Sequence, residues 1–166
     1  MRKSLTTSSA TFVTVTKRTT STLLMAGWLA LASASAFAAP ADDAAAATVD
    51  LFAKMSARDL AAVARYVPTA GFGEISPGAS SPHQLDTKAF EGLFASSMAI
   101  DLRASDVQAR ALDAHSAIVT GVRIGAITAP GATPVEGRVL FTTVWTQNAG
   151  QWQLQHIHLS AIASPK

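Results

Sequence analysis

The chain has 166 residues, no cysteine and a formal net charge of +2. Without cysteine, disulfides, thiol catalysis and thiolate metal sites are excluded. Four of the 13 basic residues and none of the 11 acidic ones stand in residues 1–38, so the remainder carries 9 basic and 11 acidic residues, a net charge of −2. A mildly acidic domain without a Lys/Arg cluster is a poor nucleic-acid binder, and we expect no nucleic-acid partner.

Residues 1–38 have the composition of a secretory signal peptide. A basic, Ser/Thr-rich stretch precedes an apolar run over 23–34, and residues 36–38 (Ala-Phe-Ala) fit a small-x-small cleavage site. The apolar run is short for a membrane-spanning helix. We therefore expect export to the periplasm or beyond, with no membrane contact after cleavage; an uncleaved anchor is the alternative. Residues 39–47 are then expected to form a flexible Ala-rich tail, and residues 48–163 one folded domain.

Helical patterns come first in this domain. Apolar residues recur at helical spacing over 49–67, the pair Ser56 and Asp59 can restart the helix at a bend, and Pro68 ends it. Residues 70–77 predict a short strand, followed by a loop over 78–84. A further helix is expected after Asp86, which can cap its N-terminus. Its apolar stripe consists of Phe90, Leu93, Phe94 and Met98.

Four long strands are predicted in the second half of the chain. Alternation over 100–111 slips at Ser105 and Asp106, which indicates a β-bulge. Residues 117–124 form a nearly continuous apolar strand, and strands over 137–147 and 151–162 make a hairpin. Helices that precede antiparallel strands favour an α+β fold, in which a curved sheet wraps the helices as a cone with one open end.

The last strand carries the polar residues that stand out. Side chains alternate between the faces of a strand, so Trp152, Leu154, His156, His158 and Ser160 are expected to share one face. That face begins apolar and ends polar, which is typical of a strand that leaves a core and enters a pocket.

These patterns resemble a known family. The motif Thr142-Thr143-Val144-Trp145, followed by Gly150-x-Trp152-x-x-x-His156-x-His158-x-Ser160, is similar to the association domain of calcium/calmodulin-dependent kinase II. The order of elements resembles the NTF2-like superfamily, in particular its SnoaL-like branch. The resemblance implies a cone-shaped fold, a pocket at the wide end and a homodimer through the sheet. The superfamily includes isomerases, cyclases, dehydratases and non-enzymatic binding or assembly domains, so the fold does not fix the function.

One position departs from the kinase domain. There, an arginine precedes the Val-Trp pair and points into the pocket, whereas this chain has Thr143. The resemblance then leaves any carboxylate-binding role to Arg123 or Arg138.

Three residues are candidates for catalysis. His156 and His158 can act as acid or base near neutral pH; a structural role for both rings is the alternative. Glu74 stands in an apolar stretch, where partial burial would favour acid/base work, and a charge partner is its alternative role. A Glu74–His156 acid/base pair is one hypothesis. The candidates for ligand binding are Phe72, Leu154, Ser160, Arg138 and Thr143.

No cofactor is expected, because no haem, flavin or nicotinamide motif is visible. A metal site is a weaker hypothesis, since two histidines supply only half of a typical shell. Its further ligands would come from Glu74, Glu91, Asp101 or His83.

Three functions remain open from the sequence. The favoured one is an exported domain that binds a small organic molecule in the cone without turnover. The second is a cofactor-free isomerase, cyclase or dehydratase. The third is a dimeric assembly module that needs no ligand.

Overall fold

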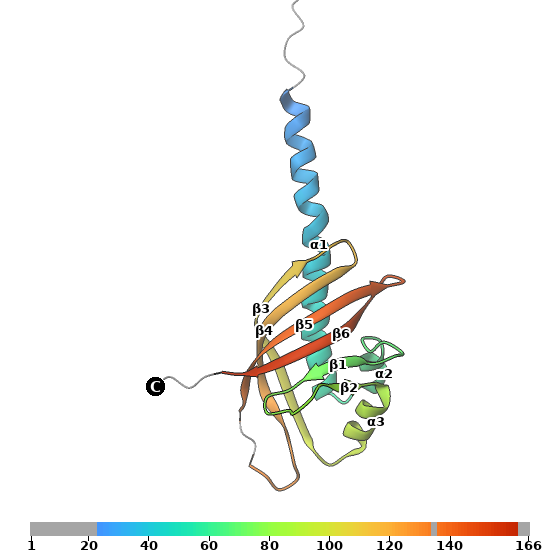
Figure 1. Ribbon diagram of the computed structural model, residues 1–166, viewed down its shortest axis with the longest axis vertical. Coiled ribbons are helices and arrows are strands. Elements are labelled where there is room, and N and C mark those ends of the chain that lie inside the picture. The colour runs from blue at the N-terminus through green and yellow to red at the C-terminus, as the bar shows by residue number, and fades with distance from the viewer. Residues whose placement is uncertain (1–22, 134–135, 163–166) are drawn as a thin grey trace, which may run out of the picture.

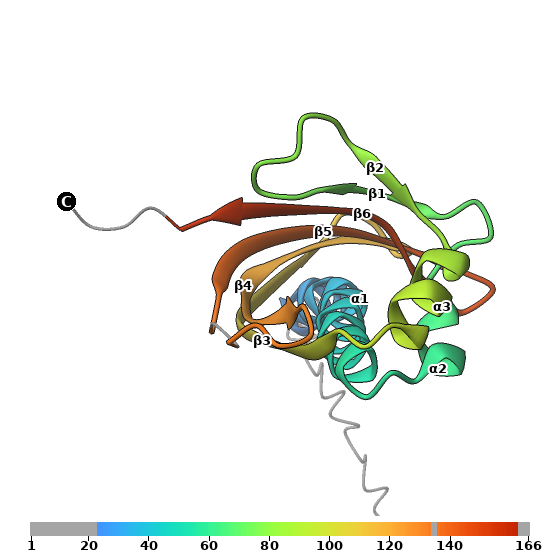
Figure 2. The same cartoon turned by 90° about the horizontal axis from the view of Figure 1, so that it is seen from below.

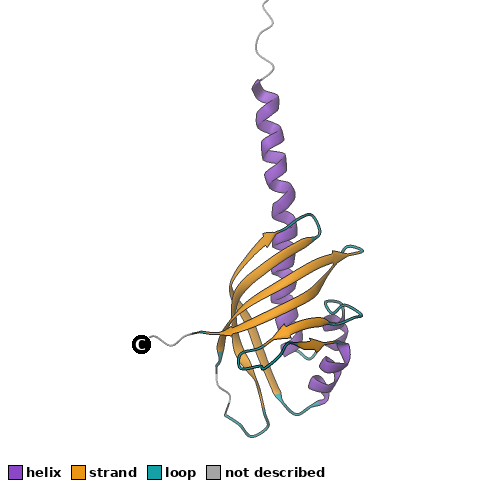
Figure 3. Cartoon of the chain, viewed as in Figure 1, coloured by secondary structure: helices purple, strands orange, loops and turns teal. Residues whose placement is uncertain are grey.

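The computed structural model describes residues 23–133 and 136–162, with side chains from Ala39 onward. It contains three helices and six strands in this part of the chain (Figures 1 and 3). Their bounds are α1 Leu23–Ser56, α2 Leu60–Ala64, β1 Phe72–Ile75, β2 His83–Leu85, α3 Thr87–Ala95, β3 Ala99–Ala111, β4 Ser116–Thr128, β5 Arg138–Asn148 and β6 Gln151–Ala161.

The six strands form one open sheet in the order β2-β1-β6-β5-β4-β3. Neighbouring strands are antiparallel, except that β1 runs parallel to β6. The sheet curves around α1, with α2 and α3 beside it (Figure 2). We call the side of the sheet that faces α1 the inner face and the opposite side the outer face. The predicted α+β fold, a curved sheet wrapped on N-terminal helices, is confirmed.

Helix α1 begins before the predicted domain boundary. Residues 39–47, expected to be a flexible tail, are helical, and Ala44 and Ala47 are buried at 0% and 7% exposure. Alanine has the highest helix propensity, and its small side chain lets α1 pack closely against β3 and β4. The predicted signal peptide, residues 1–38, lies outside the residues whose side chains are described. No helix in the described part of the chain has both the length and the apolar character needed to cross a membrane.

A short turn over residues 57–59 separates α1 from α2. Asp59 caps α2, because its Oδ1 accepts a hydrogen bond from the Ala62 amide at 3.0 Å. Ser56 has a different role: its Oγ accepts from the Leu102 amide at 2.8 Å and donates to the Leu102 carbonyl at 3.0 Å. Of the predicted pair, Asp59 therefore starts α2, while Ser56 ties the end of α1 to β3.

The strand predictions hold, with one omission. The register of β3 and β4 shifts between Ser105 and Gln108, and Asp106 has a positive φ of 53°, which confirms the predicted bulge. Asp86 caps α3 through a 3.0 Å bond to the Ala89 amide. Strand β2 overlaps the end of the segment predicted as loop, since a run of three residues, two of them exposed, gives no strand signal.

Tyr66 links α1 to the sheet. Its hydroxyl donates to Asp50 Oδ2 at 2.7 Å, and its ring meets Trp145 edge-on at a centroid distance of 5.8 Å. Burial, followed by the hydrogen bond and the negative charge of Asp50, raises the pKa of Tyr66 to about 12.

Because Tyr66 is the one tyrosine of the chain, absorbance at 295 nm reports its ionisation alone. We expect a midpoint near pH 12, and a lower one in Asp50→Asn, which removes the charge. Since the folded-state pKa lies above the ordinary value of 10, this contribution to stability is complete below pH 10 and is lost as the pH rises towards 12. A titration midpoint at pH 10 in the folded protein would contradict the contact.

Candidate functional site

An interior cavity of about 200 Å³ lies between the helices and the inner face of the sheet. Of the described residues that line it, two are charged, Glu74 on β1 and Arg123 on β4, and the others are apolar. The apolar lining consists of Leu51, Phe52, Met55, Phe72, Leu85, Ala89, Phe90, Leu93, Leu102, Ile127, Leu154, Ile157 and Leu159. Pockets that bind small organic molecules have this character, with few polar groups in an apolar wall.

Two wider hollows lie at the surface. One runs between α1, α2 and the β5–β6 hairpin and includes Asp43, Asp50, Arg65 and Tyr66. The other lies at the start of β3, where Arg103 contacts Glu136 at 2.9 Å. Both have a larger share of polar lining than the interior cavity. We therefore take the interior cavity as the candidate site.

Strand alternation on β1 brings Glu74 to the cavity. Phe72 and Glu74 line it, while Gly73 between them lies against the ring of His156: a Cβ at Gly73 would stand 2.9 Å from His156 Nδ1. The Ser76 hydroxyl donates a hydrogen bond to Glu74 Oε1. This bond holds the Glu74 carboxylate in one orientation. The carboxylate is then a hydrogen-bond acceptor at a fixed place in the cavity wall.

Arg123 lies on the inner face of β4, opposite Val139 of β5 and Ala104 of β3. Its Nε is buried and has no hydrogen-bond partner. Burial lowers the pKa of the guanidinium, and the negative charge of Glu74 opposes that shift. In the described regions the ion pairs belong to Arg103, and Arg123 contacts no carboxylate at ion-pair distance. A buried donor without an acceptor is costly, so this part of the cavity favours a ligand that brings a hydrogen-bond acceptor, and a negatively charged acceptor most.

Three of the predicted site residues meet at the cavity, namely Phe72, Leu154 and Glu74. Thr143 is fully buried, but its hydroxyl donates to the Val119 carbonyl at 3.1 Å and accepts from Trp145 Nε1 at 3.0 Å. It therefore holds Trp145 in the core and does not line the cavity. Arg138 is exposed at the start of β5.

The histidines lie on the other face of the sheet. Val144 pairs with His156, yet Trp145 pairs with Leu154, so Gln155 is an extra residue that forms a bulge in β6. The buried positions shift with it, from Trp152 and Leu154 to Ile157 and Leu159. The prediction that Trp152 and Leu154 share a face with His156, His158 and Ser160 is therefore wrong.

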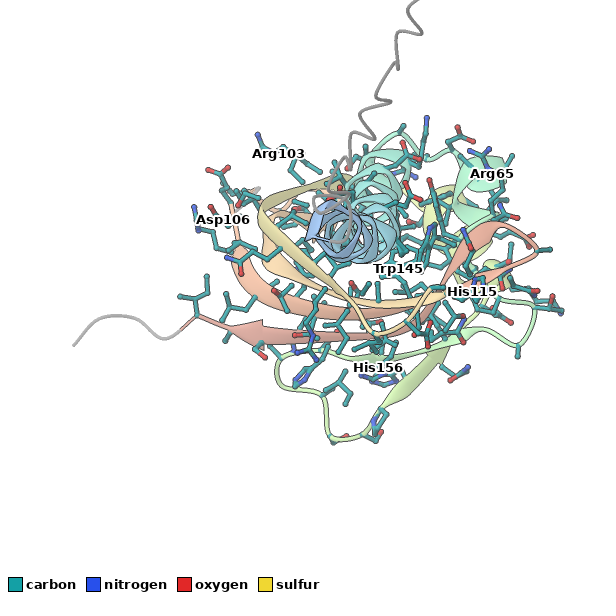
Figure 4. The ribbon with its side chains drawn as sticks, turned by 90° about the horizontal axis from the view of Figure 1, so that it is seen from above. Arg65, Arg103, Asp106, His115, Trp145 and His156 are labelled. Carbon is teal, nitrogen blue, oxygen red and sulfur yellow. The ribbon has the colours of Figure 1, made fainter. Side chains whose placement is uncertain are left out.

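Figure 4 shows the consequence: Trp145 lies on the side of α1 and His156 on the side away from it. His156 and His158 do not line the cavity that contains Glu74, and a Glu74–His156 pair does not form there. Within the described residues, no three His, Asp or Glu side chains gather as a possible metal shell. Glu91 and Asp101, two of the further candidate ligands, are exposed.

Arg123 is the site residue that the sequence reasoning undervalued. It was named only as a substitute for the arginine missing at Thr143. A stronger signal was available, because an arginine interrupts the otherwise nearly continuous apolar strand over 117–124. A charge at the centre of a buried strand marks a functional or paired position.

Comparison with known proteins places the chain among similar folds. A family model described as SnoaL-like domain matches residues 44–164. An NTF2-like protein from Cytophaga hutchinsonii superposes with a TM-score of 0.60 at 15% identity, over 73% of this chain and 97% of that one. The association domain of CaMKII from C. elegans gives 0.58 at 16% identity, over 72% and 94%.

A third similar structure is a candidate dehydratase of the NTF2-like family from Streptomyces avermitilis. Its TM-score is 0.60 at 16% identity, over 74% of this chain and 96% of that one. None of the curated protein sequences matches the chain. At these identities the likeness to solved structures establishes the fold.

Proposed function

We propose that this chain, which belongs to the SnoaL-like domain family, binds a small organic carboxylate in its interior cavity. The carboxylate lies against Arg123 and the apolar tail against the aromatic and aliphatic lining. The protein holds this molecule without converting it. Export and the pairing of two copies through the sheet, which the sequence leads us to expect, stay predictions.

The observation that carries the proposal is the half-buried guanidinium of Arg123. Its Nε is buried without a partner, and its pKa is lowered by burial. Arginine offers several donors in a planar fork that matches a carboxylate. A bound carboxylate would supply the missing acceptor and add a second negative charge to that of Glu74. A neutral ligand without an acceptor would leave the buried Nε unsatisfied.

The lining of the cavity determines the size and the polarity of the rest of the ligand. Apart from Glu74 and Arg123, the walls are aliphatic and aromatic side chains, so an apolar tail gains free energy by leaving water. The volume of about 200 Å³ suits a short chain or a single ring. Glu74 repels a second acidic group on the ligand and accepts a hydrogen bond from a hydroxyl, which favours monocarboxylates over dicarboxylates.

Hexanoate and hexan-1-ol test this proposal, because they share a six-carbon chain and differ in charge at one end. Isothermal titration calorimetry is expected to give an affinity for hexanoate at least about tenfold higher than for hexan-1-ol, which corresponds to one charge-assisted hydrogen bond. Adipate, with a second carboxylate, is expected to bind more weakly than hexanoate. Equal affinity for hexanoate and hexan-1-ol would refute the role of Arg123.

A further inference from the structure

Helix α3 forms one wall of the cavity. The cavity lies between this helix and most of the sheet. Ala89, Phe90 and Leu93 face the cavity from α3, while Leu154 and Ile157 of β6 line it from the sheet. The backbone of α3 packs against α2 and β2, at the side of the cone (Figure 2). An outward movement of α3 would therefore open the cavity, with residues 96–98, which join α3 to the start of β3, as the moving link.

In the described part of the chain, a side chain from another element binds the C-terminal end of α3 and the link that follows it. Arg58, in the turn between α1 and α2, donates through Nη1 to the carbonyls of Phe94 at 2.6 Å and Ser96 at 3.0 Å, and through Nη2 to the carbonyl of Met98. The last carbonyls of a helix lack partners within the helix and form the negative end of its dipole. A guanidinium at this place stabilises the end of α3 and ties it to the body of the protein.

The turn that carries Arg58 is itself firmly placed. Arg58 has a φ of 55°, in the left-handed region, which a residue with a side chain adopts when the surrounding structure holds it there. The amides of Ala57 and Asp59 on either side bond back to the carbonyls of Ala53 and Lys54 on α1, both at 3.0 Å. Arg58 is therefore presented by a fixed corner, and α3 is the part that can move.

We propose that α3 is the gate of the cavity and that Arg58 is the latch that keeps it closed. When Arg58 releases the carbonyls of Phe94 and Ser96, the C-terminal end of α3 moves away, and the N-terminal end, capped by Asp86, serves as the pivot. Opening separates Phe90 from Phe72, whose rings lie 6.1 Å apart, so the closed state is favoured. This inference rests on the proposed function in one respect, because the gate is the passage through which the carboxylate enters and leaves the cavity.

Hydrogen exchange followed by mass spectrometry tests the latch without any ligand. In Arg58→Gln we expect the amides of α3 to exchange about tenfold faster or more, since the bonds lost are charge-assisted, while the amides of β4 and β5 keep their rates. Arg65→Gln is the matched control, because Arg65 lies at the end of α2, is exposed and is no part of the latch. Unchanged exchange in α3 would overturn the latch.

Stopped-flow tryptophan fluorescence with hexanoate tests the gate. The association and dissociation rates are both expected to rise in Arg58→Gln, with little change in Kd, because the cavity lining is intact. A change in Kd alone, or unchanged rates alongside faster exchange in α3, would overturn the gate.

If hexanoate fails to bind the unmodified protein, the proposed function fails and hydrogen exchange still decides the latch. If Arg58→Gln does not fold, Arg58→Lys, which keeps the charge but reaches fewer carbonyls, is expected to show a smaller acceleration of exchange in α3; no acceleration would overturn the proposal.

Discussion

Replacing Arg123 by methionine is expected to weaken hexanoate binding by about a hundredfold or more while the protein stays folded. The variant removes the buried cation that the carboxylate needs, and the loss of one partner of a buried charged contact typically costs about 2–5 kcal/mol. Hexan-1-ol, which lacks the charge, is expected to bind the variant at least as well as it binds the unmodified protein. Calorimetry with both ligands measures the two effects side by side.

The stability of the same variant separates a binding role from a structural one. Arg123 has no acceptor for its buried Nε, so a flexible apolar side chain in its place removes a desolvated charge and fills the same space. We expect the midpoint of urea unfolding to stay equal or to rise. Arg110→Met, at an exposed position on β3, is the control and should change neither binding nor stability. A large loss of stability in Arg123→Met would show that the arginine has a structural partner after all.

Replacing Gly125 by alanine is expected to lower the free energy of unfolding by about 3 kcal/mol or more, the sum of overpacking and backbone strain. Gly125 lies in β4 with a φ of +96°, and an added Cβ would stand 2.0 Å from the carbonyl oxygen of Asp101 on β3. That oxygen belongs to the backbone of the paired strand and cannot yield without breaking the ladder between β3 and β4. Urea unfolding followed by circular dichroism gives the difference.

Gly92 provides the contrasting substitution. It lies in α3, and an added Cβ there would meet nothing within 4 Å. In a helix interior alanine is more favourable than glycine by about 0.5–1 kcal/mol, so Gly92→Ala should raise stability slightly. If Gly125→Ala unfolds at the same urea concentration as the unmodified protein, the close approach of β3 and β4 at this point is wrong.

Most of the fold could be predicted from local patterns. The order of helices and strands, the cap at Asp86 and the bulge near Ser105 all leave a signal within a few residues of sequence. Strand β2 leaves none, because it is a short edge strand held by its pairing with β1. The helical state of residues 39–47 was missed because burial of Ala44 and Ala47 against the sheet depends on contacts distant in sequence.

The site was harder to predict than the fold. The alternation of Trp152, Leu154, His156 and His158 is regular in sequence, yet Gln155 bulges and sends the histidines to the outer face. The change of phase of the apolar residues, from Trp152 and Leu154 to Ile157 and Leu159, is visible in the sequence, but it was interpreted as a change of surroundings and not as a bulge. A shift of one residue exchanges the faces of a strand. Glu74, Phe72 and Leu154 do line the cavity, and their roles in binding stay predictions. Arg123 was underestimated because a single charge in a strand carries no motif.

The central claim is that a small carboxylate binds in the interior cavity against Arg123. A crystal structure of the protein with hexanoate tests it most directly. The predicted result is a carboxylate within hydrogen-bond distance of the Arg123 guanidinium, with the alkyl chain between Phe90 and Leu154. Hexanoate bound instead on the outer face, beside His156 and His158, would contradict the proposal and return the function to the histidines.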